Sequence, residues 1–200
     1  VYSFNYVDVP SDKVVRMAFS RGELGPVYGV QWMRWPTPDG RHINQIQEAI
    51  NLIRKSPNSR RIIVTAWNPS DVPNMALPPC HTHFQFHVDT VANRIHLSLY
   101  MRSLDTFLGC PFNVASYALL LSMIAHITGY SPGVLTHFVG DAHFYTNHFD
   151  QINEQLSRTS FAPPTVRFDP AVKEIDQFTF ESIELLDYKH HPPIKAPVAV

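Results

Sequence analysis

The sequence predicts a mixed α/β fold. Two stretches of alternating apolar residues indicate neighbouring strands, and other stretches have apolar residues at helical spacing or almost throughout. Of the 200 residues, 44% are hydrophobic and 16% are charged, a composition that can bury a core and excludes a disordered chain. No repeat, low-complexity tract or long linker divides the chain, so we expect residues 1–200 to form one domain.

The first predicted helix spans residues 43–55. Its apolar side chains recur at helical spacing, and Ser56-Pro57-Asn58 ends the pattern. The side chains that carry the pattern are Ile43, Ile46, Ile50 and Ile53. A short β-branched apolar stretch at residues 62–67 then predicts the first strand.

Residues 82–88 and 95–101 alternate strictly and predict two strands. One face of each strand is apolar and the other is mostly polar. The apolar faces are Phe84, Phe86 and Val88, then Ile95, Leu97, Leu99 and Met101. The opposite faces are His81, His83 and His87, then His96, Ser98 and Tyr100. Because only a short connection separates the two stretches, we expect a hairpin-like pair.

The most apolar segment, residues 113–128, predicts a buried helix that stops at Gly129. We expect this helix to be too short and too interrupted to span a membrane. Residues 134–139 predict another strand, and residues 143–157 predict a helix with polar and apolar faces. Helices and strands therefore follow one another along the chain.

Charge and cysteine content exclude several classes of partner. Lys and Arg number 16 against 17 Asp and Glu, and a net charge of −1 argues against general adhesion to nucleic acid or an anionic membrane. A bound anion must therefore meet a local cluster of cations. Cys80 and Cys110 are too few for a disulfide framework, so we expect a reducing, cytoplasmic location.

Cys80 is a candidate nucleophile. Two prolines precede it and a predicted strand follows, so its backbone is restricted. A neighbouring His or Arg could favour the thiolate, which is the reactive form. The alternative is a small buried residue, because free cysteine is among the most buried residue types.

Cys80 also lies near His81, His83 and His87, which suggests a zinc site as a second interpretation. No further Cys or His cluster completes such a site, so we regard metal binding as the minor reading. Histidines at this spacing more often line a polar cleft or a solvated face.

Two arginine motifs have the donors that a phosphate needs. Ser59-Arg60-Arg61 and Arg102-Ser103 each place a guanidinium group beside a hydroxyl. The alternative for any single arginine is an ion pair on the surface.

Near the end of the chain, His143 and Tyr145 could bind a sugar hydroxyl, and the amide of Asn113 could bind the edge of a base. The alternative is that Asp141 and Asn113 cap helices.

Taken together and in order, these motifs resemble the thymidylate synthase family, from about Gly22 to the last residue. The matching blocks begin with Leu24–Gly29, Trp35–His42, Ser59–Val64 and Met75–His81. They continue with Arg102-Ser103, Asp105, Leu108-Gly109, Pro111–Tyr117, Gly140-Asp141, His143, Tyr145, Asn147-His148 and Ile194–Val200.

The resemblance implies a mixed sheet packed with helices, a central buried helix and a homodimer joined through the sheets. It implies conversion of dUMP to dTMP with 5,10-methylenetetrahydrofolate as co-substrate and without a metal. In this family the thiolate, here Cys80, adds to C6 of the pyrimidine and turns C5 into a nucleophile. The covalent route divides one difficult step into two easier ones.

The resemblance also assigns the nucleotide contacts. Arg102 and Ser103 match phosphate ligands, and Arg60 and Arg61 match arginines that reach the phosphate in the partner subunit's site. Asn113 matches the residue that binds O4 and N3 of uracil. His143 and Tyr145 match ligands of the ribose 3′-hydroxyl.

The remaining roles concern catalysis and the folate. Tyr28 matches a tyrosine that assists proton abstraction at C5, and His81 a polar neighbour of the nucleophile. Asp105 matches a residue with roles in catalysis and in pterin binding. The folate pocket also includes Gly109, Phe112 and Ala199, the last of which belongs to the closing C-terminal tail. Counting back from Leu24 without gaps, Val14 and Met17 fall at the positions of a tryptophan pair that lines this pocket in the family, unless an insertion within residues 1–16 shifts the alignment.

Departures from the family pattern leave the product and the class open. We expect the family's N-terminal segment to be missing ahead of Val1, and Met101 and Leu104 replace a usual Gln and Cys. Val14 would leave a gap through which water could reach the intermediate, which makes a phage-type dUMP hydroxymethylase, acting in a host cytoplasm, the alternative. A nucleotide- or RNA-binding member without catalysis is the alternative of another class, and a zinc hydrolase using His81, His83 and His87 is the last.

Overall fold

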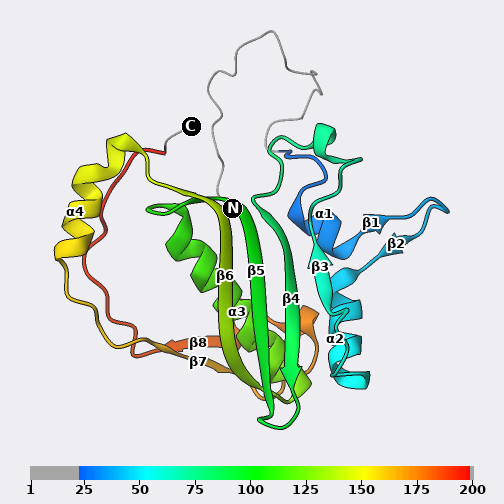
Figure 1. Cartoon of the computed structure of the whole chain (residues 1–200). Helices are drawn as coiled ribbons and strands as arrows, with labels where there is room; N and C mark the ends of the chain where they lie inside the picture. Colours follow the sequence, from blue (N-terminus) through cyan, green and yellow to red (C-terminus); the bar gives the residue numbers. More distant parts are fainter. Residues whose placement is uncertain (1–22, 199–200) are drawn as a thin grey trace.

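A four-stranded sheet forms the centre of the computed structural model, which describes residues 23–198 (Figure 1). Its strands lie in the order β3 (Ile63–Thr65), β4 (His81–Asp89), β5 (Arg94–Asp105) and β6 (Ser131–His143). β4 pairs antiparallel with both β3 and β5, whereas β6 is parallel to β5. A parallel pair needs a long crossover, and helix α3 (Gly109–Thr128) provides it across one face of the sheet.

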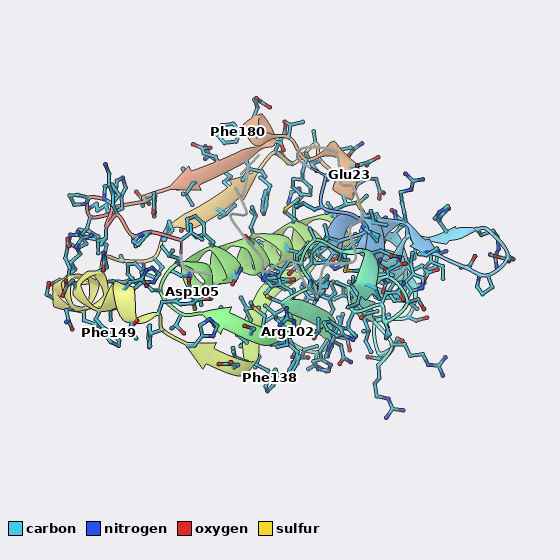
Figure 2. The ribbon with its side chains drawn as sticks, turned by 90° about the horizontal axis from the view of Figure 1, so that it is seen from above. Glu23, Arg102, Asp105, Phe138, Phe149 and Phe180 are labelled. Atoms are coloured by element: carbon cyan, nitrogen blue, oxygen red, sulfur yellow. The ribbon has the colours of Figure 1, made fainter. Side chains whose placement is uncertain are left out.

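The other elements lie around this unit. α1 (Tyr28–Met33), β1 (Trp35–Pro36), β2 (His42–Ile43) and α2 (Gln45–Lys55) are at the β3 edge, and α4 (Phe149–Ser157) is beyond β6 (Figure 1). β7 (Thr165–Phe168) and β8 (Ile183–Leu186) form an antiparallel pair on the side of α3 that faces away from the sheet (Figure 2). Single 3-10 turns occur at Val72–Asn74, Thr146–His148, Ile175–Gln177 and Phe180–Ser182.

The mixed α/β class and the expected hairpin are confirmed. Phe84 pairs with Leu99 and Phe86 with Leu97 in the register of β4 and β5. These four side chains are at most 1% exposed, because they point toward α3 and enter the hydrophobic core. None of residues 23–198 covers the opposite face of the sheet, which exposes Ile63, Tyr100, Val134 and Phe138.

α2 begins two residues later than predicted, because Ile43 belongs to β2 and Asn44 caps the helix. The Asn44 side chain accepts a hydrogen bond from the backbone N–H of Gln47 at 3.0 Å. At the other end, Arg54 donates to both carboxylate oxygens of Glu174 and to the carbonyls of Ile127 and Lys173, at 2.8–3.1 Å. This side chain therefore joins α2, the end of α3 and the segment before the 3-10 turn at Ile175.

α3 is longer and less buried than the sequence predicts. It starts at Gly109 and ends before Gly129, whose φ of 80° favours a residue without a Cβ. The side facing the sheet is buried, mainly at Tyr117, Leu121 and Ile124, while Phe112 in the first turn is 66% exposed. Among residues 23–198, α3 is the one helix that is long and apolar enough, by length and composition alone, to cross a membrane. The expectation that the helix is too short for this is therefore wrong, because the helix has 20 residues. Its buried side nevertheless packs in the hydrophobic core.

The predicted helix at residues 143–157 is wrong in its first part. β6 continues to His143, a 3-10 turn follows, and α4 starts only at Phe149. The strand persists because Ser103, Leu104 and Asp105 of β5 continue to pair with Asp141–His143. His143 is therefore held by the sheet and not by a helix.

Candidate active site

Most of the site residues predicted from the sequence lie at one end of the sheet. β4 begins at this end. β5 ends there because it is antiparallel to β4, and β6 ends there because it is parallel to β5. α3 begins at the same end, a few residues after Asp105, which is labelled with Arg102 in Figure 2. Five segments that are far apart in sequence, counting α1, thereby meet around Cys80.

Cys80 is half-buried, and its backbone is fixed from two sides. Its N–H donates to the hydroxyl of Tyr28 at 2.8 Å, and its carbonyl accepts from the N–H of Arg102 at 2.9 Å. The Arg102 side chain donates through Nε to the Pro79 carbonyl (3.0 Å) and through Nη2 to the Pro78 carbonyl (2.8 Å). Cys80 therefore stands on a rigid segment that the Arg102 guanidinium group holds, and its side chain packs against the edge of the hydrophobic core.

His81 lies on the α3 side of the sheet, apart from His83 and His87. A register shift between His81 and His83 breaks the alternation, so the predicted common face of the three histidines is wrong. His81 Nδ1 lies 3.1 Å from the hydroxyl of Tyr117, whereas His83 stacks on Tyr100 of the outer face. The three imidazoles point to opposite faces and cannot form the zinc site of the alternative interpretation.

Burial sets the charge state of this cluster. It lowers the pKa of His81 to about 4, with a smaller contribution from His137, so the imidazole is neutral at pH 7. Burial also raises the pKa of Tyr28, and the nearby Cys80 raises it further. Burial raises the pKa of Tyr117 as well, followed by the effect of Tyr28. Because His81 is uncharged, the positive charge beside Cys80 comes from Arg102.

Tyr117 is the residue that sequence reasoning missed. Its ring is 5.3 Å from His81, 5.5 Å from Phe84 and 6.4 Å from Trp32, so it joins the polar cluster to the core. In the sequence it reads as one of many apolar helix residues. The available signal was its spacing of four from Asn113, which places both on one side of the helix.

The start of α3 brings Asp105, Gly109 and Asn113 together. Oδ1 of Asp105 accepts the backbone N–H groups of Phe107 and Leu108 at 3.0 and 3.1 Å, which fixes the turn into the helix. A Cβ on Gly109 would lie 3.5 Å from both the Asp105 Cβ and Asn113 Oδ1, so Gly109 lies between these two side chains. Asn113 lies inside α3, and the alternative that it caps a helix is wrong.

His143 and Tyr145 follow the end of β6, with their rings 5.2 Å apart and nearly perpendicular. His143 pairs with Asp105 in the sheet and accepts the N–H of Thr106 at its carbonyl. Its Nδ1 is buried without a hydrogen-bond partner among residues 23–198 and lies 3.5 Å from Asp141 Oδ1. Asp141 lies within β6, so the alternative that it caps a helix is also wrong.

The arginines are divided between two places. The Arg102 guanidinium carbon lies 5.9 Å from the Trp67 ring centre, at a hollow of about 460 Å³ on the outer face. The hollow is lined by Thr65, Trp67, Thr82, His83, Tyr100 and Arg102. Arg60 and Arg61 are exposed and precede β3. They lie roughly 20 Å from Arg102 along the strand direction, at about 3.3 Å per residue. One chain therefore does not bring the three arginines together.

The other predicted site residues have simple positions. Ser103 follows Arg102 in β5 and is half-buried, and Phe112 projects from the first turn of α3. Val14, Met17 and Ala199 lie outside the described residues.

The comparison with protein families agrees with this arrangement. The family model described as thymidylate synthase matches residues 9–200, which includes every element around Cys80. A match over nearly the whole chain, together with Cys80, Arg102, Asn113 and His143 at one end of a mixed sheet, shows the family. The chain belongs to the thymidylate synthase family.

Proposed function

We propose that this protein converts dUMP to dTMP with 5,10-methylenetetrahydrofolate, using Cys80 as the nucleophile. Family membership makes the protein a transferase of a one-carbon group to C5 of dUMP. The observation that carries the finer proposal is the fixed position of Cys80 between Tyr28 and Arg102, at the end of the sheet that also holds Asn113, His143 and Tyr145. Residues 1–200 form one catalytic domain in this proposal.

Cys80 activates a carbon that is otherwise unreactive. Its thiolate bonds to C6 of uracil, and the electron pair of the C5–C6 double bond moves toward C5 and O4. The Asn113 amide is suited to hydrogen-bond O4 and N3 while charge develops there. C5 then takes the one-carbon group and loses its proton, and the Cys80–C6 bond breaks to release the product.

Tyr28 and His81 act as neutral groups in this scheme. With its raised pKa, Tyr28 keeps its proton at pH 7 and assists the departure of the C5 proton by hydrogen bonding, not as a phenolate. The neutral His81, oriented by Tyr117, supplies a polar group without a second positive charge beside the thiolate.

Arg102 remains able to bind phosphate while it holds the Cys80 segment. Its Nε and Nη2 bind the two proline carbonyls, and Nη1 forms no further hydrogen bond within residues 23–198. Ser103 offers a hydroxyl next to it, and His143 and Tyr145 are placed to bind the ribose 3′-hydroxyl. One guanidinium group thus couples the position of the nucleophile to that of the phosphate.

The start of α3 fits the folate. Phe112 and Val114 expose apolar surface there, beside an Asp105 carboxylate whose Oδ2 accepts no hydrogen bond within the described part of the chain. A pterin needs such an apolar wall with one carboxylate acceptor. The folate supplies the one-carbon group and, for methylation, the hydride. Gly109, Ala199, Val14 and Met17 complete this pocket in the proposal.

The activity is tested by release of tritium from C5 of labelled dUMP in the presence of 5,10-methylenetetrahydrofolate. We expect release from the wild-type protein, none from Cys80→Ala and wild-type rates from Cys110→Ala, the matched control cysteine. Binding of dUMP without any release by the wild type would favour the non-catalytic nucleotide- or RNA-binding alternative.

The mass of the product separates the two enzymatic alternatives. Val14 and Met17 at the tryptophan positions favour entry of water, which would convert the C5 methylene group to 5-hydroxymethyl-dUMP and release tetrahydrofolate. We expect dTMP with dihydrofolate, because the remaining site residues match the synthase. A hydroxymethyl product would overturn methylation while leaving the role of Cys80 intact.

We further propose a homodimer in which the outer faces of two sheets meet. Among the exposed apolar residues of this face, Val134 is 57% and Phe138 53% exposed, and Phe138 points away from α3 in Figure 2. A second copy on this face would cover these side chains. It would also allow Arg60 and Arg61 of one protomer to approach the hollow beside Arg102 of the other, which a single chain does not achieve.

Sedimentation analysis tests the dimer with two matched substitutions. Phe138→Glu should give monomers, whereas Phe180→Glu, at an 89% exposed position beyond α3, should leave the dimer intact. Mixing Cys80→Ala with Arg60→Ala/Arg61→Ala protein should then restore activity, because hybrid dimers contain one complete site. A monomeric wild type, or no restoration on mixing, would contradict the shared site.

A further inference from the structure

Helix α1 carries Tyr28, whose hydroxyl accepts the backbone N–H of Cys80. Isolated helices of six residues are unstable in water, so contacts with other segments must hold α1 in place. Trp32 packs its ring on Phe84 of the core, with the ring centres 5.2 Å apart. Apolar packing has little directional preference, whereas a hydrogen bond constrains both distance and angle. The polar contacts of α1 therefore fix the position of the Tyr28 hydroxyl most closely.

The main polar contact comes from Gln31, one helical turn after Tyr28, whose side chain is completely buried (0% exposed). Its Nε2 donates both hydrogens, to the Pro26 carbonyl at 2.9 Å and to Oδ2 of Asp71 at 2.7 Å. Its Oε1 accepts from Nδ2 of Asn68 at 3.2 Å. Every polar atom of this side chain is thus hydrogen-bonded, as a buried amide requires.

Asn68 and Asp71 belong to the segment between β3 and β4, which passes beside α1 in Figure 1. Oδ2 of Asp71 accepts from Gln31 and also from Nδ2 of Asn68, at 3.1 Å. The three side chains therefore form a closed hydrogen-bonded triangle. Among residues 23–198, two of the three buried polar side chains, Gln31 and Asn68, belong to it.

The backbone of Gln31 is held as well. Gln45 of α2 donates through Nε2 to the carbonyls of Gln31 and Thr65, at 2.7 and 2.8 Å, and its Oε1 accepts the N–H of Thr65 at 2.9 Å. Thr65 ends β3, and the chain then runs through Asp71 to Cys80. α1 is thus attached to this chain at three places, through Gln45, through the triangle and through the hydroxyl of Tyr28.

We propose that Gln31 and Asp71 are positioning residues, which place the Tyr28 hydroxyl for removal of the C5 proton by holding α1 against the segment that leads to Cys80. The catalytic consequence rests on the proposed function. The hydroxyl that holds the Cys80 N–H is also the group that assists proton loss, so a small displacement of α1 changes both interactions together. Arg102 lies on β5 and is held by the sheet and two proline carbonyls, so binding of the dUMP phosphate should depend little on α1.

Two substitutions at the half-buried Asp71 separate loss of the bond from loss of the side chain. Asp71→Ala removes the acceptor of both amides. Asp71→Asn keeps an oxygen at the place of Oδ2 and turns its new amide nitrogen toward the place of Oδ1, which accepts no hydrogen bond within residues 23–198. Gln31→Met removes the amide from the other side at a similar volume. The Asp71 variants carry the test alone if this buried substitution does not fold.

Asp89→Ala is the matched control. Oδ1 of this half-buried aspartate also accepts two hydrogen bonds, from the N–H groups of Val91 and Ala92 at 3.0 and 2.8 Å. Asp89 ends β4, whereas Cys80 lies just before its start, so the control loses comparable bonds at the opposite end of the sheet. A general loss of stability should therefore affect both alanine variants, and a loss of positioning only Asp71→Ala.

The rate of tritium release from C5 of dUMP gives the first readout. In Asp71→Ala and Gln31→Met we expect the kcat for release to fall roughly tenfold, because the Tyr28 hydroxyl is displaced. The dissociation constant for dUMP, measured by equilibrium dialysis, should stay within about twofold, and Asp71→Asn should recover most of the kcat. Asp89→Ala should keep the wild-type kcat. An equal loss of dUMP affinity, or no recovery in Asp71→Asn, would overturn the proposal.

Hydrogen exchange of the Cys80 N–H, measured by NMR on the free protein, gives a readout that does not need catalysis. This N–H should exchange roughly tenfold faster in Asp71→Ala than in the wild type, Asp71→Asn or Asp89→Ala. The N–H of Phe86, which donates to the Ile62 carbonyl at 2.9 Å within the sheet, should exchange at the wild-type rate in Asp71→Ala. These results in a protein without tritium release would disprove the proposed function and leave the positioning of Tyr28 intact. Equal exchange of the Cys80 N–H in all variants would disprove the positioning whatever the activity.

Discussion

The neutrality of His81 makes a quantitative prediction about pH. Burial, with a smaller effect of His137, lowers its pKa in the folded protein from 6.5 to about 4. The unfolded chain therefore takes up a proton first as the pH falls, and stability is lost between these two values and retained above them. At about 1.4 kcal/mol per pH unit, the loss from His81 between about pH 7.5 and 4.5 is roughly 2–3 kcal/mol.

The perturbation is His81→Gln, which cannot titrate, and the control is His42→Gln at an exposed position in β2. Urea unfolding at fixed protein concentration, followed by tryptophan fluorescence, gives the free energy of unfolding at each pH. The test quantity is the difference between the two pH values, so any constant cost of losing the contact with Tyr117 cancels. We expect the difference to shrink by roughly 2–3 kcal/mol in His81→Gln and to stay unchanged in His42→Gln.

A wild-type pH dependence in His81→Gln would refute the reasoning. It would mean that the imidazole is protonated equally in the folded and unfolded chains, so that the contact with Tyr117 does not require a neutral ring. An NMR titration of the His81 ring provides an independent check, with no change of its carbon-bound proton signals expected between about pH 8 and 5.5.

Two further predictions concern the support of the site. Tyr28→Phe leaves the N–H of Cys80 without its acceptor, so we expect the free energy of unfolding to fall by about 1–3 kcal/mol and tritium release to slow. Urea unfolding and the tritium-release assay measure these two effects. Unchanged values in both assays would contradict the prediction. Ile53→Ala, at a 0% exposed position of α2, should cost about 2–5 kcal/mol in the same unfolding measurement, and a loss below about 1 kcal/mol would mean that the cavity collapses.

The elements with one buried face could be predicted from the sequence. Phe84, Phe86, Leu97 and Leu99 alternate because one side of their strands packs against α3, and the isoleucines of α2 recur at helical spacing for the same reason. The parallel pairing of β5 with β6 could not be predicted, since it depends on how α3 crosses the sheet. β7 and β8 were missed because each is only four residues long and largely exposed, without a clear pattern.

The candidate site residues could be named from the order of their motifs along the chain, but the contacts that depend on long-range packing could not be predicted. Its prolines alone left Cys80 as readily a buried residue as a nucleophile, and its place in an ordered set of motifs made it the candidate nucleophile. The position of His81 was wrong because a single register shift moves a side chain to the other face of the sheet, and the alternation gave no sign of it. Tyr117 was missed because its partner lies 36 residues away in another element.

The contacts of Arg54 have a consequence for how the chain folds. This one side chain bridges residues separated by 73 and 120 positions, so its bonds can form only after α2, α3 and the segment around Glu174 have all been brought together. Contacts with such long loops form late, because the loss of chain entropy comes before any gain. Arg54→Ala should therefore speed unfolding in a stopped-flow experiment and leave the refolding rate nearly unchanged. This guanidinium group would then slow unfolding without being part of the folding nucleus.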